Sequence, residues 1–320
     1  MNAMHGRICL VTGATSGIGK ATAQGLAELG ATVALVARHR HKGQATVEEI
    51  REKTGNANLD VLVADLSSQA EIRKLADEFK RRYSALHVLV NNAGGIFGER
   101  LITQDGIEMT LALNHLAPFL LTDLLLDVLK ASAPARVINL TSGAQVMGKI
   151  NFDDLEGKKR YDGQAAYNQS KLANVLFTYE LARRLAPHLP SAYVKEGAGQ
   201  APHLPSVHLE EGAGQAGSGV SVNCVHPGAV RTNYGRENPT RLLRIVIPLL
   251  APLLRTPEKG AETVLYLATS PEVEGVTGKY FVDKRARPSS KRSYDTQVAA
   301  RLWQVSEEMT GLAMKEERVS

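Results

Sequence analysis

Short apolar runs alternate with longer amphipathic segments along most of the 320-residue chain, and this alternation constrains the fold more than any other feature. Strands are predicted at residues 7–12, 32–37, 59–64, 87–91, 135–140, 220–225 and 279–282. Helices are predicted at residues 17–29, 43–53, 69–83, 110–129, 165–186 and 257–268. Such alternation is typical of βαβ units, and strands that are apolar throughout fit burial on both faces. The sequence therefore predicts an α/β fold with a doubly wound parallel sheet flanked by helices, which binds ligands at the carboxyl ends of its strands.

A tandem repeat interrupts this alternation. Residues 186–200 (APHLPSAYVKEGAGQ) and 201–215 (APHLPSVHLEEGAGQ) are identical at 11 of 15 positions. Their prolines and Gly-Ala-Gly runs disfavour both helix and strand, so we expect a duplicated surface loop; a partner-binding loop is the alternative. Without these 30 residues the chain has 290, which suits a single domain over residues 1–320 rather than two.

Composition and charge exclude several classes of protein. Hydrophobic residues at 43% and charged residues at 22% are ordinary globular values, which exclude a disordered or fibrous chain. The net charge of +5 is scattered and aromatic residues make up only 5%, which argues against nucleic-acid binding. Cys9 and Cys224 lie in apolar runs and indicate buried thiols in a reducing compartment. There is no cationic and apolar leader, and the longest apolar stretch, residues 242–254, is too short to span a bilayer. We therefore expect a cytoplasmic protein without a transmembrane segment or a metal site.

The first strand runs directly into a glycine-rich turn and a helix. The turn reads Gly13-Ala14-Thr15-Ser16-Gly17-Ile18-Gly19. Glycines allow a tight turn and a close approach of the backbone to a pyrophosphate, and the helix N-terminus offers N–H groups and a favourable dipole to the anion. A plain strand–helix turn is the alternative, but the strand–turn–helix context is the one that a nucleotide-binding motif requires. Gly13, Thr15, Ser16, Gly17, Ile18 and Gly19 are thus predicted to bind a cofactor.

Three further motifs follow in order along the chain. They are Asn91-Asn92-Ala93-Gly94 after the fourth strand, Tyr167-x-x-x-Lys171 in a long helix, and His226-Pro227-Gly228 after the sixth strand. Together with the Gly-x-x-x-Gly-x-Gly spacing they resemble the classical short-chain dehydrogenase/reductase family, whose fold is a single Rossmann-type sheet. The 25-residue separation of Ser142 and Tyr167, and the sequence from residue 260 to 312, resemble its retinol-dehydrogenase-like branch.

The end of the second strand indicates which cofactor binds. An acidic residue about 20 positions after the glycines would bind the ribose 2′-hydroxyl of NAD, whereas a cation accommodates a 2′-phosphate. The chain has Arg38 there, in the run Arg-His-Arg-His-Lys, with no acid. This predicts NADP(H), with Arg38 as the principal contact and Lys20 as a helper; a solvated charge run is the alternative. The resemblance implies that Asp65, followed by Leu66, contacts the adenine, while an N-cap for the next helix is the alternative for Asp65.

Tyr167 and Lys171 are four residues apart and lie on one face of the predicted helix. A phenol with a pKa of about 10 is a poor acid or base at neutral pH, and a neighbouring ammonium lowers that pKa. The resemblance implies that Lys171 also holds the nicotinamide ribose, that Ser142 hydrogen-bonds the reacting oxygen and that Asn114 relays a proton. The alternatives are Thr141 in place of Ser142, although Thr141 should face away, and a helix-distorting role for Asn114. His115 is interpreted as structural.

The remaining cofactor contacts follow from the family motifs. They are predicted at Asn92, Ala93, Gly94, Tyr167, Lys171, Pro227, Gly228, Val230 and Thr232. The apolar segment 233–256 lies where the family builds a substrate lid, and we expect a lid over a lipophilic substrate. Peripheral membrane contact and core packing are alternatives.

Taken together, the sequence predicts an NADP(H)-dependent oxidoreductase that interconverts an alcohol and an aldehyde or ketone on a small, lipophilic molecule. A non-catalytic NADP sensor or scaffold protein of the same fold is the alternative. The Ser142, Tyr167 and Lys171 set argues against a pure sensor, which has little physical need for it.

Overall fold

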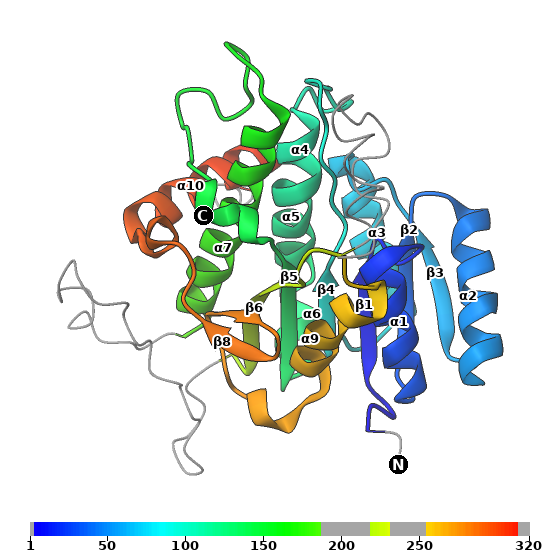
Figure 1. Cartoon of the computed structure of the whole chain (residues 1–320). Helices are drawn as coiled ribbons and strands as arrows, with labels where there is room; N and C mark the ends of the chain where they lie inside the picture. Colours follow the sequence, from blue (N-terminus) through cyan, green and yellow to red (C-terminus); the bar gives the residue numbers. More distant parts are fainter. Residues whose placement is uncertain (1–2, 187–217, 231–253, 313–320) are drawn as a thin grey trace, which may run out of the picture.

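An eight-stranded sheet forms the centre of the computed structural model, which describes residues 3–186, 218–230 and 254–312 (Figure 1). The strands are β1 (Ile8–Thr12), β2 (Thr32–Ala37), β3 (Leu59–Val63), β4 (Val88–Asn91), β5 (Ala135–Leu140), β6 (Val220–His226), β7 (Lys279–Val282) and β8 (Arg285–Arg287). Their order is β3-β2-β1-β4-β5-β6-β7-β8, and all neighbours are parallel except β7 and β8. The strand order reverses between β1 and β4, where a doubly wound sheet opens a crevice for ligands.

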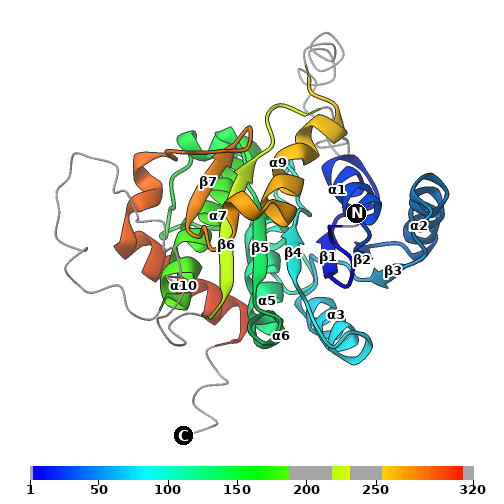
Figure 2. The same ribbon diagram turned by 90° about the horizontal axis from the view of Figure 1, so that it is seen from below.

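Helices cover both faces of the sheet. The α-helices are α1 (Gly17–Glu28), α2 (Arg40–Thr54), α3 (Gln69–Arg82), α4 (Met109–Leu111), α5 (Ala117–Leu124), α6 (Leu126–Ala131), α7 (Gly163–Leu185), α9 (Pro257–Thr269) and α10 (Thr296–Thr310). Shorter helical segments are η1 (Ala112–Leu116), η2 (Gly143–Met147), η5 (Pro271–Val273) and η6 (Lys291–Tyr294). One large core cluster joins the sheet to α3, α5, α6, α7 and α10, and the other joins it to α1, α2 and α9. Figure 2 shows these two layers on opposite sides of the strands.

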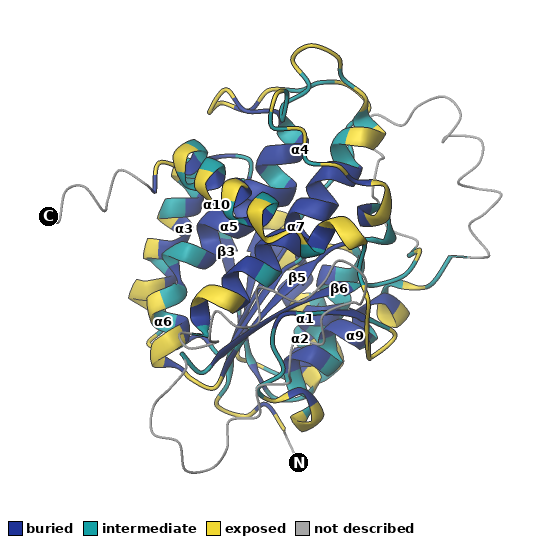
Figure 3. Cartoon of the chain, turned by 90° about the vertical axis from the view of Figure 1, so that its left-hand side faces the viewer, coloured by how far each residue is buried: buried dark blue, intermediate teal, exposed yellow. Residues whose placement is uncertain are grey.

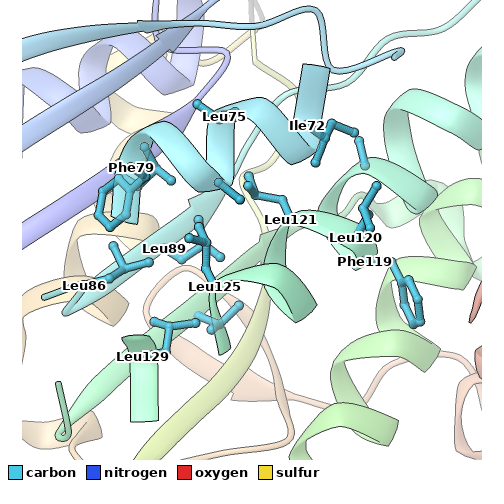
Figure 4. Packing of buried hydrophobic residues seen from close by; sticks show 14 of the residues in the cluster. Ile72, Leu75, Phe79, Leu86, Leu89, Phe119, Leu120, Leu121, Leu125 and Leu129 are labelled. Atoms are coloured by element: carbon cyan, nitrogen blue, oxygen red, sulfur yellow. The ribbon is translucent and has the colours of Figure 1, made fainter. Parts of the chain in front are cut away.

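The helix α3 illustrates how the sequence builds one of these layers. The Ser68 hydroxyl caps its N-terminus by accepting a hydrogen bond from the backbone N–H of Glu71. Its buried residues recur at helical spacing (Ile72, Leu75, Ala76 and Phe79). Figure 4 shows Ile72, Leu75 and Phe79 packed with leucines of α5 and of the segment before β4. Burial of each large side chain contributes about 1.5–3 kcal/mol. Figure 3 shows the same arrangement as buried strands with exposed residues on the outer faces of the helices.

Most of the expected elements are present, although α2 begins three residues before the expected start at residue 43. The seven predicted strands are present, with ends that differ by at most one residue. The single helix predicted at residues 110–129 is wrong, because α4, the π-helical η1, α5 and α6 share this stretch. In the π turn Ala117 donates to the carbonyl of Ala112, five residues earlier, and Pro118, which follows, has no N–H for the carbonyl of Asn114. The edge strand β8 and the helix α10 were not predicted.

Some expectations lie outside the described residues. The structure does not describe the duplicated segment 186–215, except for Ala186. It also does not describe Thr232 or the expected lid at 233–256, except for the last three residues of the lid. Within the part of the chain that the structure describes, no helix is long and apolar enough to cross a membrane.

Candidate active site

A cleft of about 810 Å³ opens at the carboxyl ends of the parallel strands. Its walls come from the loops that follow β1, β2, β3, β4, β5 and β6. The predicted site residues that line it are Gly13, Thr15, Ser16, Gly17, Ile18, Arg38, Asp65, Leu66, Asn92, Ala93, Gly94, Ser142, Tyr167, Lys171, Pro227, Gly228 and Val230. Gly19 and Asn114 lie behind this surface. The fold thus brings residues from six separate loops into one cavity.

The glycine-rich turn has the backbone that its sequence requires. Gly13 and Gly17 have φ values of +63° and +55°, a region that favours glycine. A Cβ on Gly19 would lie 2.3 Å from Nδ2 of Asn92 and 2.4 Å from the carbonyl oxygen of Gly13. Gly19 therefore permits the close packing of α1 on the turn, and the N-terminus of α1 directs its dipole toward the cleft.

The loop after β4 is tied to the glycine-rich turn. The side-chain amide of Asn92 donates to the carbonyl oxygen of Thr12 at 2.7 Å and to that of Gly13 at 3.2 Å. The Thr12 hydroxyl accepts hydrogen bonds from the backbone N–H groups of Asn92 and Ala93. Asn92 thus lines the cleft, and its side chain holds the backbone of the glycine-rich turn in place.

Arg38 and Asp65 lie at the end of the cleft formed by β2 and β3. Arg38 follows β2 and is exposed. Asp65 accepts hydrogen bonds from the N–H and hydroxyl groups of Ser67, and Ser68 caps α3, so the N-cap alternative for Asp65 is wrong. Lys20 forms an ion pair with Glu49 of α2 and does not line the cleft. The structure thus gives Lys20 another partner than the one expected.

Tyr167 and Lys171 project from the first turns of α7, whose N-terminus Asp162 caps by accepting from the N–H of Ala165. Nζ of Lys171 lies 5.5 Å from the centroid of the Tyr167 ring and 3.4 Å from the carbonyl oxygen of Leu140. Lys171 is only 4% exposed, and this burial lowers its pKa from 10.5 to about 8. A lysine in this setting is still charged at neutral pH and lies beside the phenol.

The two hydroxyl groups after β5 have different surroundings. Thr141 lines the cleft beside Ser142, but its hydroxyl already donates to the backbone carbonyl oxygen of Lys171 at 2.8 Å. The Ser142 hydroxyl accepts from the N–H of Ala144 at 3.2 Å and keeps its own proton to donate. The next residue, Gly143, donates its N–H to Nδ1 of His226 at 3.2 Å. Ser142 is therefore the better hydrogen-bond donor to a substrate oxygen.

Asn114 lies in η1 and connects the loop after β4 to α7. Its amide donates to the carbonyl oxygen of Gly95 at 2.8 Å and to the hydroxyl of Ser170 at 2.9 Å, and its oxygen accepts from the N–H of Gly95. Asn114 does lie in the π-helical η1, but its side chain bonds other segments and not the backbone of its own helix, as the alternative of a helix-distorting residue would have required. His115 is buried and bonded to Ser306, and burial lowers its pKa to about 4, in agreement with a structural role.

Sequence reasoning missed the apolar wall of the cleft. Its side chains come from the loop after β4 and from α4 and η1 (Ile96, Phe97, Leu101, Met109 and Leu113). The apolar pair that directly follows the Asn-Asn-Ala-Gly-Gly sequence was the available signal. Among the described residues, no group of three or more His, Cys, Asp or Glu side chains could hold a metal ion.

Fold and site together define a Rossmann-type oxidoreductase, because a glycine-rich turn and a Tyr–Lys pair share one cleft at the switch point of the sheet. The sequence profile of the short chain dehydrogenase family matches residues 7–192, more than half of the chain. The protein belongs to this family, in its retinol-dehydrogenase-like branch.

Curated relatives and solved structures agree with this assignment. Human retinol dehydrogenases 14 and 12 are 39% and 41% identical to the chain, over 97% of its length and 88% of theirs. A crystal structure of an uncharacterized protein from Mycobacterium paratuberculosis is 30% identical, with a TM-score of 0.70, over 96% of this chain and 94% of that chain. The RhlG/NADP active-site complex of Pseudomonas aeruginosa is 27% identical, with a TM-score of 0.63, over 88% of this chain and 95% of that chain.

Proposed function

We propose that the protein is an NADP(H)-dependent oxidoreductase that interconverts an alcohol and an aldehyde or ketone on a small, lipophilic substrate. The observation that carries the proposal is the placement of Ser142, Tyr167 and Lys171 in the same cleft as the glycine-rich turn and Arg38. Its relatives at about 40% identity are named as retinol dehydrogenases, whose substrate is a lipophilic alcohol.

The cleft residues fit a phosphorylated dinucleotide. Gly13 and Gly17 line the cleft with backbone conformations that favour glycine, and Gly19 lets α1 pack closely on the turn, so the turn and the helix N-terminus can approach a pyrophosphate. Arg38 would contact the 2′-phosphate, a position where a carboxylate would repel it. A solved neighbour at 27% identity is an NADP complex. When bound, this cofactor supplies or takes up the hydride.

The protein's own residues move the proton and orient the substrate. In the reductive direction the Tyr167 hydroxyl gives its proton to the carbonyl oxygen as the alcohol forms, and in the oxidative direction it takes the proton back. The Ser142 hydroxyl donates a hydrogen bond to the same oxygen, and the Lys171 ammonium stabilises the phenolate. Positioned proton transfer contributes about 10²–10⁴-fold to the rate.

The apolar wall supports a lipophilic substrate. Phe97, Leu101 and Met109 line the cleft and offer apolar surface to a hydrocarbon chain. Burial of each methylene group contributes about 0.8 kcal/mol, so the affinity should rise with chain length.

The test is NADPH oxidation with aldehydes and ketones of graded chain length. We expect turnover with kcat/KM that rises with chain length, and loss of turnover in Tyr167→Phe while NADPH binding, followed by fluorescence, stays intact. Absence of turnover in the unmodified protein over the whole panel, with NADPH still bound, would instead favour the non-catalytic sensor.

A further inference from the structure

The long separation of Ser142 and Tyr167 has a structural counterpart. The chain between them, before α7 begins, passes over the loop that follows β4 and over α4. Figure 1 shows α4 beside the start of α7 at the upper end of the molecule. Tyr161, Glu156 and Gly163 each hold residues 156–163 against the loop after β4 or against the start of α4.

Tyr161 makes the first contact. Its hydroxyl lies 3.0 Å from Oε1 of Glu108 and 3.1 Å from the carbonyl oxygen of Phe97, with the hydroxyl of Thr110 at 3.2 Å. Burial, together with the neighbouring Glu108 carboxylate, raises the pKa of Tyr161 to about 12, so the phenol remains a neutral donor. One side chain thus holds both the loop and the start of α4.

Glu108 is the buried partner in this contact and is only 1% exposed. Its two carboxylate oxygens cap α4 by accepting from the N–H groups of Thr110 and Leu111, each at 2.8 Å. Met109, the first residue of α4 and a wall residue of the cleft, lies between Glu108 and the two N–H groups that Glu108 caps. The position of Met109 therefore depends on a carboxylate that Tyr161 holds.

Glu156 and Gly163 make the other two contacts. The carboxylate of Glu156 accepts from the backbone N–H of Glu108 at 3.2 Å, and its carbonyl oxygen accepts from Nε of Arg100 at 2.9 Å. A Cβ on Gly163 would lie only 2.1 Å from the carbonyl oxygen of Phe97, so the two backbones meet there. The segment before α7 is thereby fastened to both ends of the apolar wall.

We propose that Tyr161 is a positioning residue that holds Phe97 and Met109 in place and so sets how well the enzyme accepts substrates with long apolar chains. A wall that is already ordered before binding avoids the cost of ordering it around each substrate. A short carbonyl compound that occupies only the space beside Tyr167 and Ser142 gains nothing from this wall. The inference rests on the proposed function, and it deepens it by assigning the selectivity for chain length to a named contact.

The test compares Tyr161→Phe with Tyr83→Phe. Each variant removes only a hydroxyl from a half-buried tyrosine that donates to a carboxylate, and Tyr83 bonds Asp60 at 2.8 Å without lining the cleft. In Tyr161→Phe we expect KM for long-chain aldehydes to rise about tenfold with kcat nearly unchanged, and KM for the shortest aldehyde to stay the same. Tyr83→Phe should match the unmodified enzyme with both substrates. Equal changes for long and short aldehydes, or no change in either, would overturn the proposal.

A second variant and a second measurement keep the two proposals apart. Gly163→Ala displaces the Phe97 backbone without touching any hydroxyl, and it should give the same dependence on chain length. Binding of straight-chain alcohols of graded length, followed by the rise in Tm in the presence of NADPH, probes the wall without turnover. If the unmodified protein shows no turnover, the proposed function fails, while a length-dependent rise in Tm that Tyr161→Phe loses still supports the wall. Failure of every alcohol to raise Tm overturns the inference itself.

Discussion

Nδ1 of His226 accepts a hydrogen bond of 3.2 Å from the backbone N–H of Gly143, the residue that follows Ser142. The end of β6 is thereby fastened to the loop that presents the Ser142 hydroxyl. Only a neutral imidazole has a nitrogen that can accept this bond. Burial, reinforced by the charge of Arg255 and opposed by that of Asp283, lowers the pKa of His226 from its usual 6.5, so the acceptor form prevails at neutral pH.

Two substitutions of His226 distinguish the role of its hydrogen-bond acceptor from that of its side-chain volume. Asn can present its oxygen where Nδ1 lies, whereas Leu fills the space without an acceptor. We expect His226→Leu to lower kcat about tenfold, because the loop of Ser142 loses its anchor, and His226→Asn to retain most of kcat. Steady-state kinetics at saturating NADPH gives both values. Equal losses in the two variants would show that the hydrogen bond is not what matters.

Arg38 should decide the preference for the phosphorylated cofactor. In Arg38→Asp, loss of the cation and repulsion by the new carboxylate should weaken NADPH about 100-fold and leave NADH unchanged or better bound. Arg40→Asp makes the same change of charge two residues away, at the start of α2 and outside the cleft lining, and should keep the NADPH preference. Dissociation constants for both cofactors, measured by fluorescence titration, check this. A selectivity that is the same in Arg38→Asp as in the parent would remove Arg38 from the site.

The sheet was predictable because its strands are buried on both faces and so read as continuous apolar runs. The missed elements lack such a signal. The strand β8 has the sequence Arg-Ala-Arg and is exposed at the antiparallel edge, and the buried face of α10 includes Ser306 and Thr310, whose hydroxyls bond carbonyls of their own helix. Polar residues at buried positions weaken the periodic apolar pattern by which helices are predicted from a sequence.

The site was predictable where neighbours in sequence carry the chemistry, as in the glycine-rich turn and the Tyr167–Lys171 pair. Contacts between distant residues were not, because nothing in a single sequence pairs Tyr161 with Glu108, 53 positions away. The local pattern also gave Asn114 its place in a helix but not the π turn that directs its amide to Gly95 and Ser170. A π turn has no apolar period of its own from which it could be predicted.

Gly19 should be irreplaceable although it lies inside a helix. Alanine is favoured over glycine in helices by about 1 kcal/mol, but the Cβ of Gly19→Ala would meet the carbonyl of Gly13 and the amide of Asn92, and such overpacking costs roughly 1–3 kcal/mol. We expect a lower free energy of unfolding in urea and weaker NADPH binding. Gly25→Ala in the same helix meets only the flexible end of Leu265 and should be neutral or stabilising. The expectation fails if both variants behave alike.

The charge of Lys171 should limit activity at high pH. Because burial lowers its pKa to about 8, kcat/KM for carbonyl reduction should fall as the pH rises through about 8. This fall is not unfolding caused by Lys171: between pH 8 and 10.5 the unfolded chain holds more protons on this lysine, so its contribution to stability rises with pH. The arginine in Lys171→Arg keeps its charge throughout this range. The variant should be less active, and its kcat/KM should not fall as the pH rises through about 8. A pH profile with the same decline in both proteins would assign it to another group.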